Sequence, residues 1–210
     1  MCREVVQMRG YISIVDYGVG NLKSVANALA YLGEECRVTH DPAELERSSA
    51  VILPGVGSFP AGMDKLSSSG LDRCVIEQGR KKPVLGICLG MQLMLERGEE
   101  VRPCSGLGVL KGRAARIPTA LKLPHIGWNT LAFPNPCPLF QGLEEGTAVY
   151  FVHSFSAQDT DPGQAAAVTD YGGPVTAALW SGNFFGCQFH PEKSGEAGLA
   201  ILRNFAALDR

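Results

Sequence analysis

Short apolar runs alternate with amphipathic segments in the first part of the chain. Residues 11–16, 50–53 and 83–85 are apolar runs of the length expected for buried strands. Apolar side chains recur every three or four positions between them, which predicts helices. The first helix starts near Asn21, ends at Gly33 and carries Leu22, Val25, Ala26, Leu29 and Leu32. This alternation indicates a parallel sheet with helices on both faces.

Two more helices complete this part: one carries Leu71, Cys74, Val75 and Gln78, and one covers residues 91–96. After Gly106 the pattern changes to shorter strands separated by turn residues. The predicted strands are residues 108–117, 127–133, 148–155, 164–169, 175–180 and 184–189, with a hairpin loop at 181–183. A last helix carries Leu199, Ile201, Leu202 and Phe205. We therefore expect a single α/β domain with a mostly parallel sheet and added antiparallel strands.

Composition narrows the functional classes. The chain has 210 residues, of which 45% are hydrophobic and 19% charged, as in an ordinary globular domain. A formal net charge of -2 without a basic cluster argues against nucleic acid as a partner. No apolar run approaches the roughly 18 residues of a membrane span, and residues 1–7 hold no signal-peptide core, so we expect a cytoplasmic location. Residues 1–9 are expected to be a disordered extension before a domain at 10–210.

Cysteines are numerous but have no metal-binding spacing. The seven are Cys2, Cys36, Cys74, Cys88, Cys104, Cys137 and Cys187. An odd number without Cys-x-x-Cys predicts no metal site, and in a reducing compartment most would be small buried hydrophobes. The segment 16–21 partly resembles a dinucleotide loop, but position 23 is Lys23 where the motif needs glycine. We therefore expect neither a metal nor a cofactor.

One cysteine is placed for chemistry. In Gly86-Ile87-Cys88-Leu89-Gly90, an apolar strand precedes Cys88 and helix-forming residues follow it. Flanking glycines permit the tight strand–turn–helix geometry of a nucleophile elbow. The helix N-terminus favours the thiolate, and the Leu89 backbone N–H is free to bind an oxyanion. The alternative, on this pentapeptide alone, is a glycine-flanked cysteine packed in the core.

A matching base lies near the end of the chain. A cysteine nucleophile needs an imidazole to carry its proton, and the imidazole needs an acceptor to orient it. His190-Pro191-Glu192 offers both, since residues two apart in an extended segment face the same side. A histidine near a glutamate is by itself more often surface polarity than catalysis. The elbow cysteine favours the catalytic interpretation.

A glycine-rich loop, Pro54-Gly55-Val56-Gly57, leaves the strand at 50–53. It could present a second backbone N–H to an oxyanion or change orientation, because glycine tolerates positive φ. A plain strand-to-helix turn is the simpler alternative for this segment alone.

Together these three segments resemble the class I (triad) glutamine amidotransferases, from Gly10 to the C-terminus. The resemblance implies a flavodoxin-like three-layer sandwich and a glutaminase with Cys88 as nucleophile, His190 as general base and acid, and Glu192 orienting it. It also implies an oxyanion hole from the N–H of Leu89 and one from Val56 or Gly57. Positions that match the family's glutamine-binding residues are Gln92, Glu100, His153, Ser154 and Phe155. For Glu100 a solvated acid, and for His153 a buried strand histidine, remain open.

Segments 16–21, 123–129 and 150–155 are similar to one branch of that family, the glutaminase subunits of imidazole glycerol phosphate synthases. The resemblance implies a 1:1 heterodimer with a (β/α)8-barrel cyclase, which forms imidazole glycerol phosphate and aminoimidazole carboxamide ribotide. Asn21, Trp128 and Lys193 match positions that contact the cyclase. Ammonia is mostly protonated in neutral water, so a glutaminase needs an adjoining acceptor site that is shielded from solvent. Because a glutaminase domain uses the whole chain, we expect the acceptor enzyme to be a separate chain.

Three alternatives remain from the sequence. Glutaminases of anthranilate or GMP synthesis are similar, although segments 124–129 and 150–154 favour the first branch. A cysteine peptidase or deglycase would have its histidine close behind the elbow cysteine rather than at position 190. A binding module that lost catalysis is disfavoured by the intact Cys88, His190 and Glu192.

Overall fold

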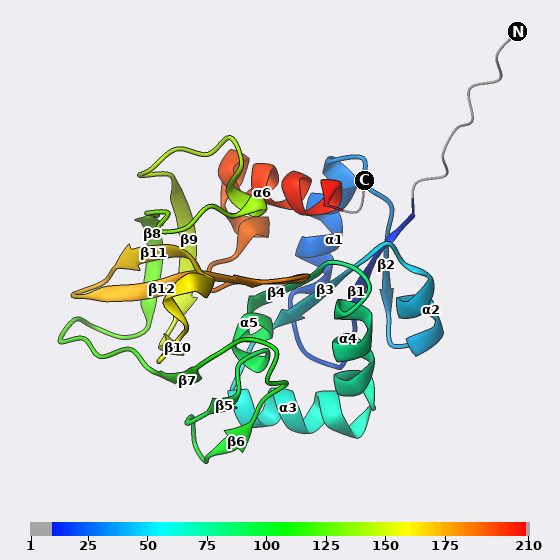
Figure 1. Ribbon diagram of the computed structural model, residues 1–210, viewed down its shortest axis with the longest axis horizontal. Helices are drawn as coiled ribbons and strands as arrows, with labels where there is room; N and C mark the ends of the chain where they lie inside the picture. Colours follow the sequence, from blue (N-terminus) through cyan, green and yellow to red (C-terminus); the bar gives the residue numbers. More distant parts are fainter. Residues whose placement is uncertain (1–9, 209–210) are drawn as a thin grey trace, which may run out of the picture.

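A computed structural model of the chain describes residues 10–208 as one central sheet between two helical layers, with two small sheets beside it (Figure 1). The central sheet has seven strands in the order β11-β12-β13-β4-β3-β1-β2. Its strands are β1 (Ile12–Val15), β2 (Cys36–Thr39), β3 (Ala50–Gly55), β4 (Val84–Cys88), β11 (Ala165–Asp170), β12 (Pro174–Ser181) and β13 (Phe184–Cys187). Neighbours from β13 to β2 are parallel, whereas β11 and β12 are antiparallel.

Helices cover both faces of this sheet. The helices are α1 (Leu22–Tyr31), α2 (Pro42–Arg47), α3 (Phe59–Ser68), α4 (Leu71–Gly79), α5 (Leu89–Leu93) and α6 (Gly195–Ala207). Figure 1 shows α1 and α6 on one side of the sheet and α3, α4 and α5 on the other. Successive side chains of a strand pack into opposite apolar cores. Ile52 packs toward α1 and α6, and Leu53 packs toward α3 and α4. No helix of residues 10–208 is long and apolar enough to cross a membrane.

The two small sheets come from the second half of the chain. One has the order β10-β7-β5-β6, and the other pairs β8 with β9. Their strands are β5 (Arg97–Gly98), β6 (Cys104–Ser105), β7 (Arg113–Arg116), β8 (His125–Thr130), β9 (Ala148–His153) and β10 (Phe155–Gln158). Three short 3-10 helices are η1 (Pro138–Phe140), η2 (Pro162–Gln164) and η3 (Pro191–Lys193). The predicted three-layer α/β architecture is confirmed, and the predicted extension at 1–9 lies outside the described residues.

Several predicted boundaries were wrong. The helix after the elbow ends at Leu93 instead of continuing to 96, because backbone groups of residues 93–96 form hydrogen bonds with residues 106–112. The strand expected at 108–117 is only Arg113–Arg116. The strand expected at 148–155 divides into β9 and β10, which pair with different partners. Periodicity also missed β2, α2 and α3, whose apolar patterns are short or broken.

Candidate active site

Cys88 lies at the junction of β4 and α5 in a backbone conformation that residues other than glycine rarely adopt. Its φ is 53° and its ψ is −110°. The sharp turn brings the first turn of α5 against the neighbouring strand, so that a Cβ on Gly90 would collide with the Leu53 carbonyl oxygen. A Cβ on Gly86 would lie 2.7 Å from the Gly90 carbonyl carbon. Only glycine fits at both positions, and the structure therefore holds Cys88 on the predicted elbow.

The glycine-rich loop lies directly beside the elbow. Strand β3 pairs with β4 up to Gly55, which is in register with Cys88. The chain then leaves the sheet through Val56 and Gly57, and Gly57 has a φ of 100°. Because the carboxyl ends of parallel strands share one edge, this loop and the start of α5 meet above that edge.

His190 and Glu192 form the second half of the site. His190 Nδ1 is 2.8 Å from Glu192 Oε1, and both side chains are almost fully buried. Burial lowers the pKa of His190, but contacts with Cys88 and Glu192 outweigh it and raise the pKa to about 9. With Nδ1 on the carboxylate, Nε2 is the nitrogen that remains for Cys88. The imidazole is therefore charged at neutral pH and placed to carry a proton for the sulfur.

A hydrogen-bonded turn fixes the position of His190. Its backbone N–H donates to the Tyr150 carbonyl at 2.9 Å. The Ser194 hydroxyl donates to the His190 carbonyl at 2.7 Å and accepts the Tyr150 N–H at 3.0 Å. Glu192 Oε2 is buried and has no hydrogen-bond partner among residues 10–208, so the bonding of this carboxylate is directed to His190.

A cavity of about 380 Å³ opens at this point, within the size range of small-molecule sites. Its lining includes eleven of the residues singled out from the sequence: Val56, Gly57, Cys88, Leu89, Gln92, Glu100, His153, Ser154, Phe155, His190 and Lys193. Pro124 and Val152 also line it and were not predicted. The structure thus brings five separate segments of the chain, 56–57, 88–100, 124, 152–155 and 190–193, to one pocket.

Gln188 is a site residue that the sequence analysis missed. Its side chain is fully buried, and its Nε2 lies 3.7 Å from the Cys88 sulfur. Its Oε1 accepts a hydrogen bond of 2.9 Å from Gln92 Nε2, which also donates to the Phe155 carbonyl at 2.9 Å. The extended segment expected at His190–Glu192 is not formed: residues 188–189 form a bend and Pro191–Lys193 is a 3-10 helix, so a two-residue alternation could not have identified Gln188.

The His153 side chain is fully engaged inside the protein. Nδ1 donates to the Phe155 carbonyl at 2.8 Å, so Nε2 is the acceptor of a 3.1 Å bond from His125 Nδ1. Burial, followed by nearby positive charge, lowers the pKa of His153 to about 4. His153 is therefore a neutral, buried strand histidine whose ring contacts the pocket without a free nitrogen.

Glu100 joins the pocket to the start of α3. Its Oε2 accepts the backbone N–H of Phe59 at 2.8 Å, at a helix N-terminus where the Ser58 side chain makes no capping bond. Negative charge is favoured there by the helix dipole. Glu100 is therefore a partly buried capping acid that also lines the cavity.

Two of the three residues expected at a partner interface, Trp128 and Lys193, lie at or next to η3. The Trp128 side chain is 59% exposed and packs edge-on against Tyr150. A Cβ on Gly195 would lie 3.9 Å from the Trp128 ring, and the exposed Lys193 is two residues before Gly195 at the end of η3. Asn21 precedes α1, which packs against η3. An exposed aromatic residue beside the pocket marks this surface as a candidate docking site.

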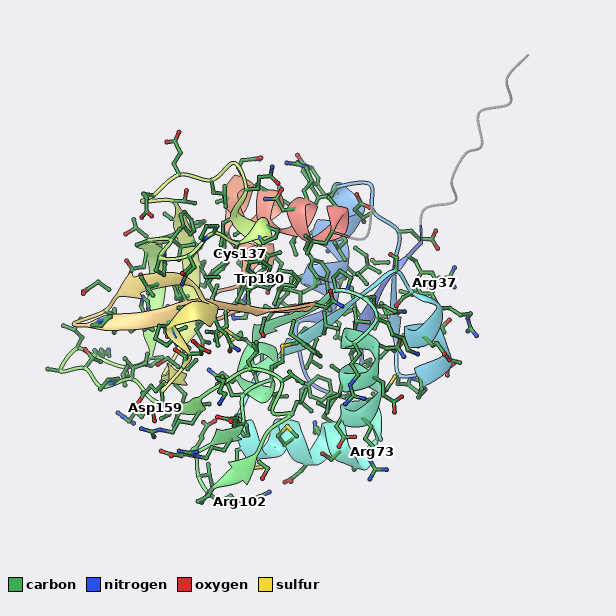
Figure 2. All side chains as sticks on the ribbon, viewed as in Figure 1. Arg37, Arg73, Arg102, Cys137, Asp159 and Trp180 are labelled. Atoms are coloured by element: carbon green, nitrogen blue, oxygen red, sulfur yellow. The ribbon has the colours of Figure 1, made fainter. Side chains whose placement is uncertain are left out.

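Two of the other buried cysteines, Cys137 and Cys187, lack comparable surroundings. Cys137 lies near Trp180 on the α6 side of the sheet (Figure 2), and burial raises its pKa to about 11. Cys187 is completely buried, which raises its pKa well above the ordinary value. Both are protonated, poorly reactive thiols at neutral pH. No group of three His, Cys, Asp or Glu side chains within residues 10–208 could hold a metal ion.

Comparisons with known proteins agree with this geometry. Residues 13–208 match the family "Glutamine amidotransferase class-I". The chain is 50% identical to the imidazole glycerol phosphate synthase subunit HisH of Bacillus cereus (strain ATCC 14579) over 196 residues, covering 92% of this chain and 93% of the relative. It is 48% identical to the HisH subunit of Bacillus thuringiensis (strain Al Hakam), with the same coverage of both chains.

Solved structures share the fold at lower identity. A putative GMP synthase protein from Thermoplasma acidophilum superposes with a TM-score of 0.73 at 20% identity, covering 96% of this chain and 94% of that one. PurLQS from Thermotoga maritima superposes with a TM-score of 0.72 at 22% identity, covering 94% and 98%. These two show the fold alone. The family match and the HisH relatives show that the chain belongs to the class I glutamine amidotransferases.

Proposed function

We propose that this chain is the glutaminase subunit of an imidazole glycerol phosphate synthase and acts in histidine biosynthesis. It hydrolyses L-glutamine to L-glutamate and ammonia and passes the ammonia to a cyclase subunit. The observation that carries the proposal is the convergence of Cys88 and His190 in one cavity, with Glu192 bonded to the far side of the imidazole. Relatives of about 50% identity that are named HisH subunits support the choice of this branch.

The chemistry follows from the triad. In the reactive form His190 already carries the proton of Cys88, and the thiolate attacks the carboxamide carbon of glutamine to form a tetrahedral oxyanion. The C–N bond then breaks, and His190 returns the proton to the departing nitrogen, so that ammonia leaves and a glutamyl thioester remains. Water, deprotonated by His190, attacks the thioester and releases glutamate and the free thiol. Glu192 keeps Nε2 directed at the sulfur throughout.

The negative oxygen of each tetrahedral intermediate requires hydrogen-bond donors. We assign this role to the backbone N–H of Leu89 and to one N–H from Val56 or Gly57. These residues meet at the cavity edge where β3 and β4 end. Donors at fixed positions contribute most when water is excluded, and the buried elbow satisfies that condition.

Polar groups around the cavity fit the rest of glutamine. Glu100 Oε1 would accept from the substrate ammonium, and the Gln92 carbonyl oxygen is the free end of a side chain whose amide hydrogens are already engaged. Because both ring nitrogens of His153 are engaged, segment 153–155 would contact the substrate through its backbone and the Ser154 side chain.

The product, ammonia, requires a partner subunit that accepts it. Free ammonia would be protonated in water and lost as a nucleophile, so the acceptor site must adjoin this cavity. We place a (β/α)8-barrel cyclase, in a 1:1 heterodimer, on the surface formed by Asn21, Trp128 and Lys193. A cytoplasmic location accords with Cys88 and the other described cysteines being free thiols.

A glutaminase assay of three samples tests the proposal: the chain alone, the chain with the cyclase, and the complex with the cyclase's nucleotide ligand. We expect little glutamate from the chain alone and a large increase in the liganded complex, with one imidazole glycerol phosphate formed per glutamate. Equal activity in all three samples, or no glutamine hydrolysis in any of them, would contradict it. Hydrolysis that depends instead on the synthase subunit of another pathway would assign the chain to that synthase.

A further inference from the structure

Tyr17 lies beneath the glycine-rich loop. It follows β1, is 6% exposed, and packs in the apolar cluster that contains Leu53 and Leu89. Its buried hydroxyl donates a 2.9 Å hydrogen bond to the carbonyl of Pro54. None of the sequence arguments assigned this side chain a role.

The Pro54 carbonyl lies beyond the point where β3 stops pairing with β1. Strand β1 pairs with β3 only as far as Ile14 and Ile52, while β3 continues along β4 to Gly55. Beyond Ile52, therefore, the β1 side of β3 has no further strand pairing. The Tyr17 hydroxyl replaces the missing ladder contact at Pro54, immediately before the chain turns into Val56 and Gly57.

The same hydroxyl also limits where the loop can start. A Cβ on Gly55 would lie 2.7 Å from the Tyr17 hydroxyl, 2.8 Å from the Gly90 nitrogen and 2.8 Å from the Leu89 Cβ. The Tyr17 hydroxyl and the first turn of α5 thus pack together against the face of Gly55 on which a side chain would lie. A shift of this peptide would change the relation between the Gly57 N–H and the Leu89 N–H.

We propose that Tyr17 is a positioning residue that holds the Pro54–Gly57 loop in register with the elbow and so preorganises the second oxyanion donor. This inference rests on the proposed glutaminase function. Tyr17 does not touch substrate; it acts through the Pro54 carbonyl. Its effect should therefore fall on transition-state stabilisation and leave glutamine binding intact.

Tyr17→Phe removes only the hydroxyl, and Tyr11→Phe is a matched control. The Tyr11 hydroxyl also donates to a backbone carbonyl, that of Glu44, at 2.7 Å, and Tyr11 is similarly buried, but it lies at the other end of β1. The experiment measures kcat and KM for glutamine in the cyclase complex with its nucleotide ligand. The rate of Cys88 alkylation by iodoacetamide is measured in parallel, because that reaction forms no oxyanion.

We expect Tyr17→Phe to lower kcat about five- to tenfold, as for one neutral hydrogen bond, with KM within about twofold of wild type. Its alkylation rate and all parameters of Tyr11→Phe should match wild type. An unchanged or increased kcat in Tyr17→Phe, or an equal loss in Tyr11→Phe, would overturn the inference. Absence of hydrolysis in the wild-type complex would instead reject the proposed function, so the two failures are distinguishable.

Discussion

Gly55 and Cys88 face each other at the last pair of the β3–β4 ladder. This pairing puts a flexible loop and a strained nucleophile on one sheet edge, although 33 positions separate them in the sequence. One strand end thus supplies the nucleophile, and its neighbour supplies the loop assigned to the oxyanion. The position of the site follows from the parallel pairing of these two strands.

Replacing Cys88 with alanine tests the nucleophile. We expect glutamine hydrolysis to fall by at least about 10⁴-fold, because no other group can form the thioester. Ammonia-driven synthesis by the complex should persist, since the cyclase site is untouched. Glutamate release and product formation are measured separately, and Cys104→Ala, outside the cavity, is the control. Residual hydrolysis close to wild type would show that another residue attacks glutamine.

Glu192→Gln tests the charge on the imidazole. Loss of the carboxylate lowers the pKa of His190 from about 9. We expect the high-pH limb of the glutaminase rate profile to move to lower pH, with activity reduced about 10²-fold or more. A profile that keeps the wild-type high-pH limb would contradict this assignment.

The same ionisation affects stability. Because the folded pKa of His190, about 9, exceeds the ordinary value of 6.5, its stabilising contribution is complete below pH 6.5 and is lost as pH rises through 9. Urea unfolding at pH 6 and pH 9.5 should show a larger loss in wild type than in Glu192→Gln. Equal losses in the two proteins would indicate that His190 does not cause the change.

Gly90→Ala tests the packing of the elbow. The new methyl group would collide with the Leu53 carbonyl oxygen, so we expect a loss of about 3 kcal/mol in the free energy of unfolding. Gly163→Ala is the control, since its added Cβ would meet only the Asp161 carboxylate at 3.3 Å. Denaturant titration compares the two. Equal stability of both variants would mean that the close approach at Gly90 is relaxed in solution.

Glu100 combines two roles that two substitutions separate. Glu100→Gln keeps an oxygen for the Phe59 N–H but removes the charge, so we expect nearly normal stability and a KM for glutamine raised about tenfold. Glu100→Ala removes the cap as well and should cost a further ~1 kcal/mol of stability. An unchanged KM in both variants would leave Glu100 as a structural cap only.

Trp128→Ala tests the docking surface. An exposed aromatic residue at an interface centre contributes about 2 kcal/mol, so we expect the Kd for the cyclase to rise roughly 30-fold. Glutamate release should then exceed product formation, because ammonia escapes. Val38→Ala, a partly exposed apolar residue on the edge strand β2, is the control. Unchanged affinity and coupling would remove Trp128 from the interface.

Local chemistry made the elbow predictable. Glycines on both sides of Cys88 and the spacing of His190 and Glu192 are features of contiguous sequence, and each carries its own physical reason. Continuous apolar runs likewise predicted β1, β3 and β4 of the central sheet, because both faces of these strands are buried.

Features that depend on distant contacts were not accessible in this way. Gln188 is recognisable only once Cys88 and Gln92 are seen on either side of it. Glu100 caps a helix 41 positions earlier in the chain, which no local pattern encodes. The helix at α5 is cut short because tertiary hydrogen bonds outcompete the helix-forming tendency of residues 94–96.

Trapping the covalent intermediate shows directly whether Cys88 attacks glutamine. The liganded cyclase complex is mixed with isotopically labelled glutamine, quenched in acid within one turnover, digested and mapped by mass spectrometry. We expect a labelled glutamyl group on the peptide that contains Cys88, and no label in Cys88→Ala. Glutamine hydrolysis without such an adduct, or with the label on Cys137 or Cys187, would contradict it.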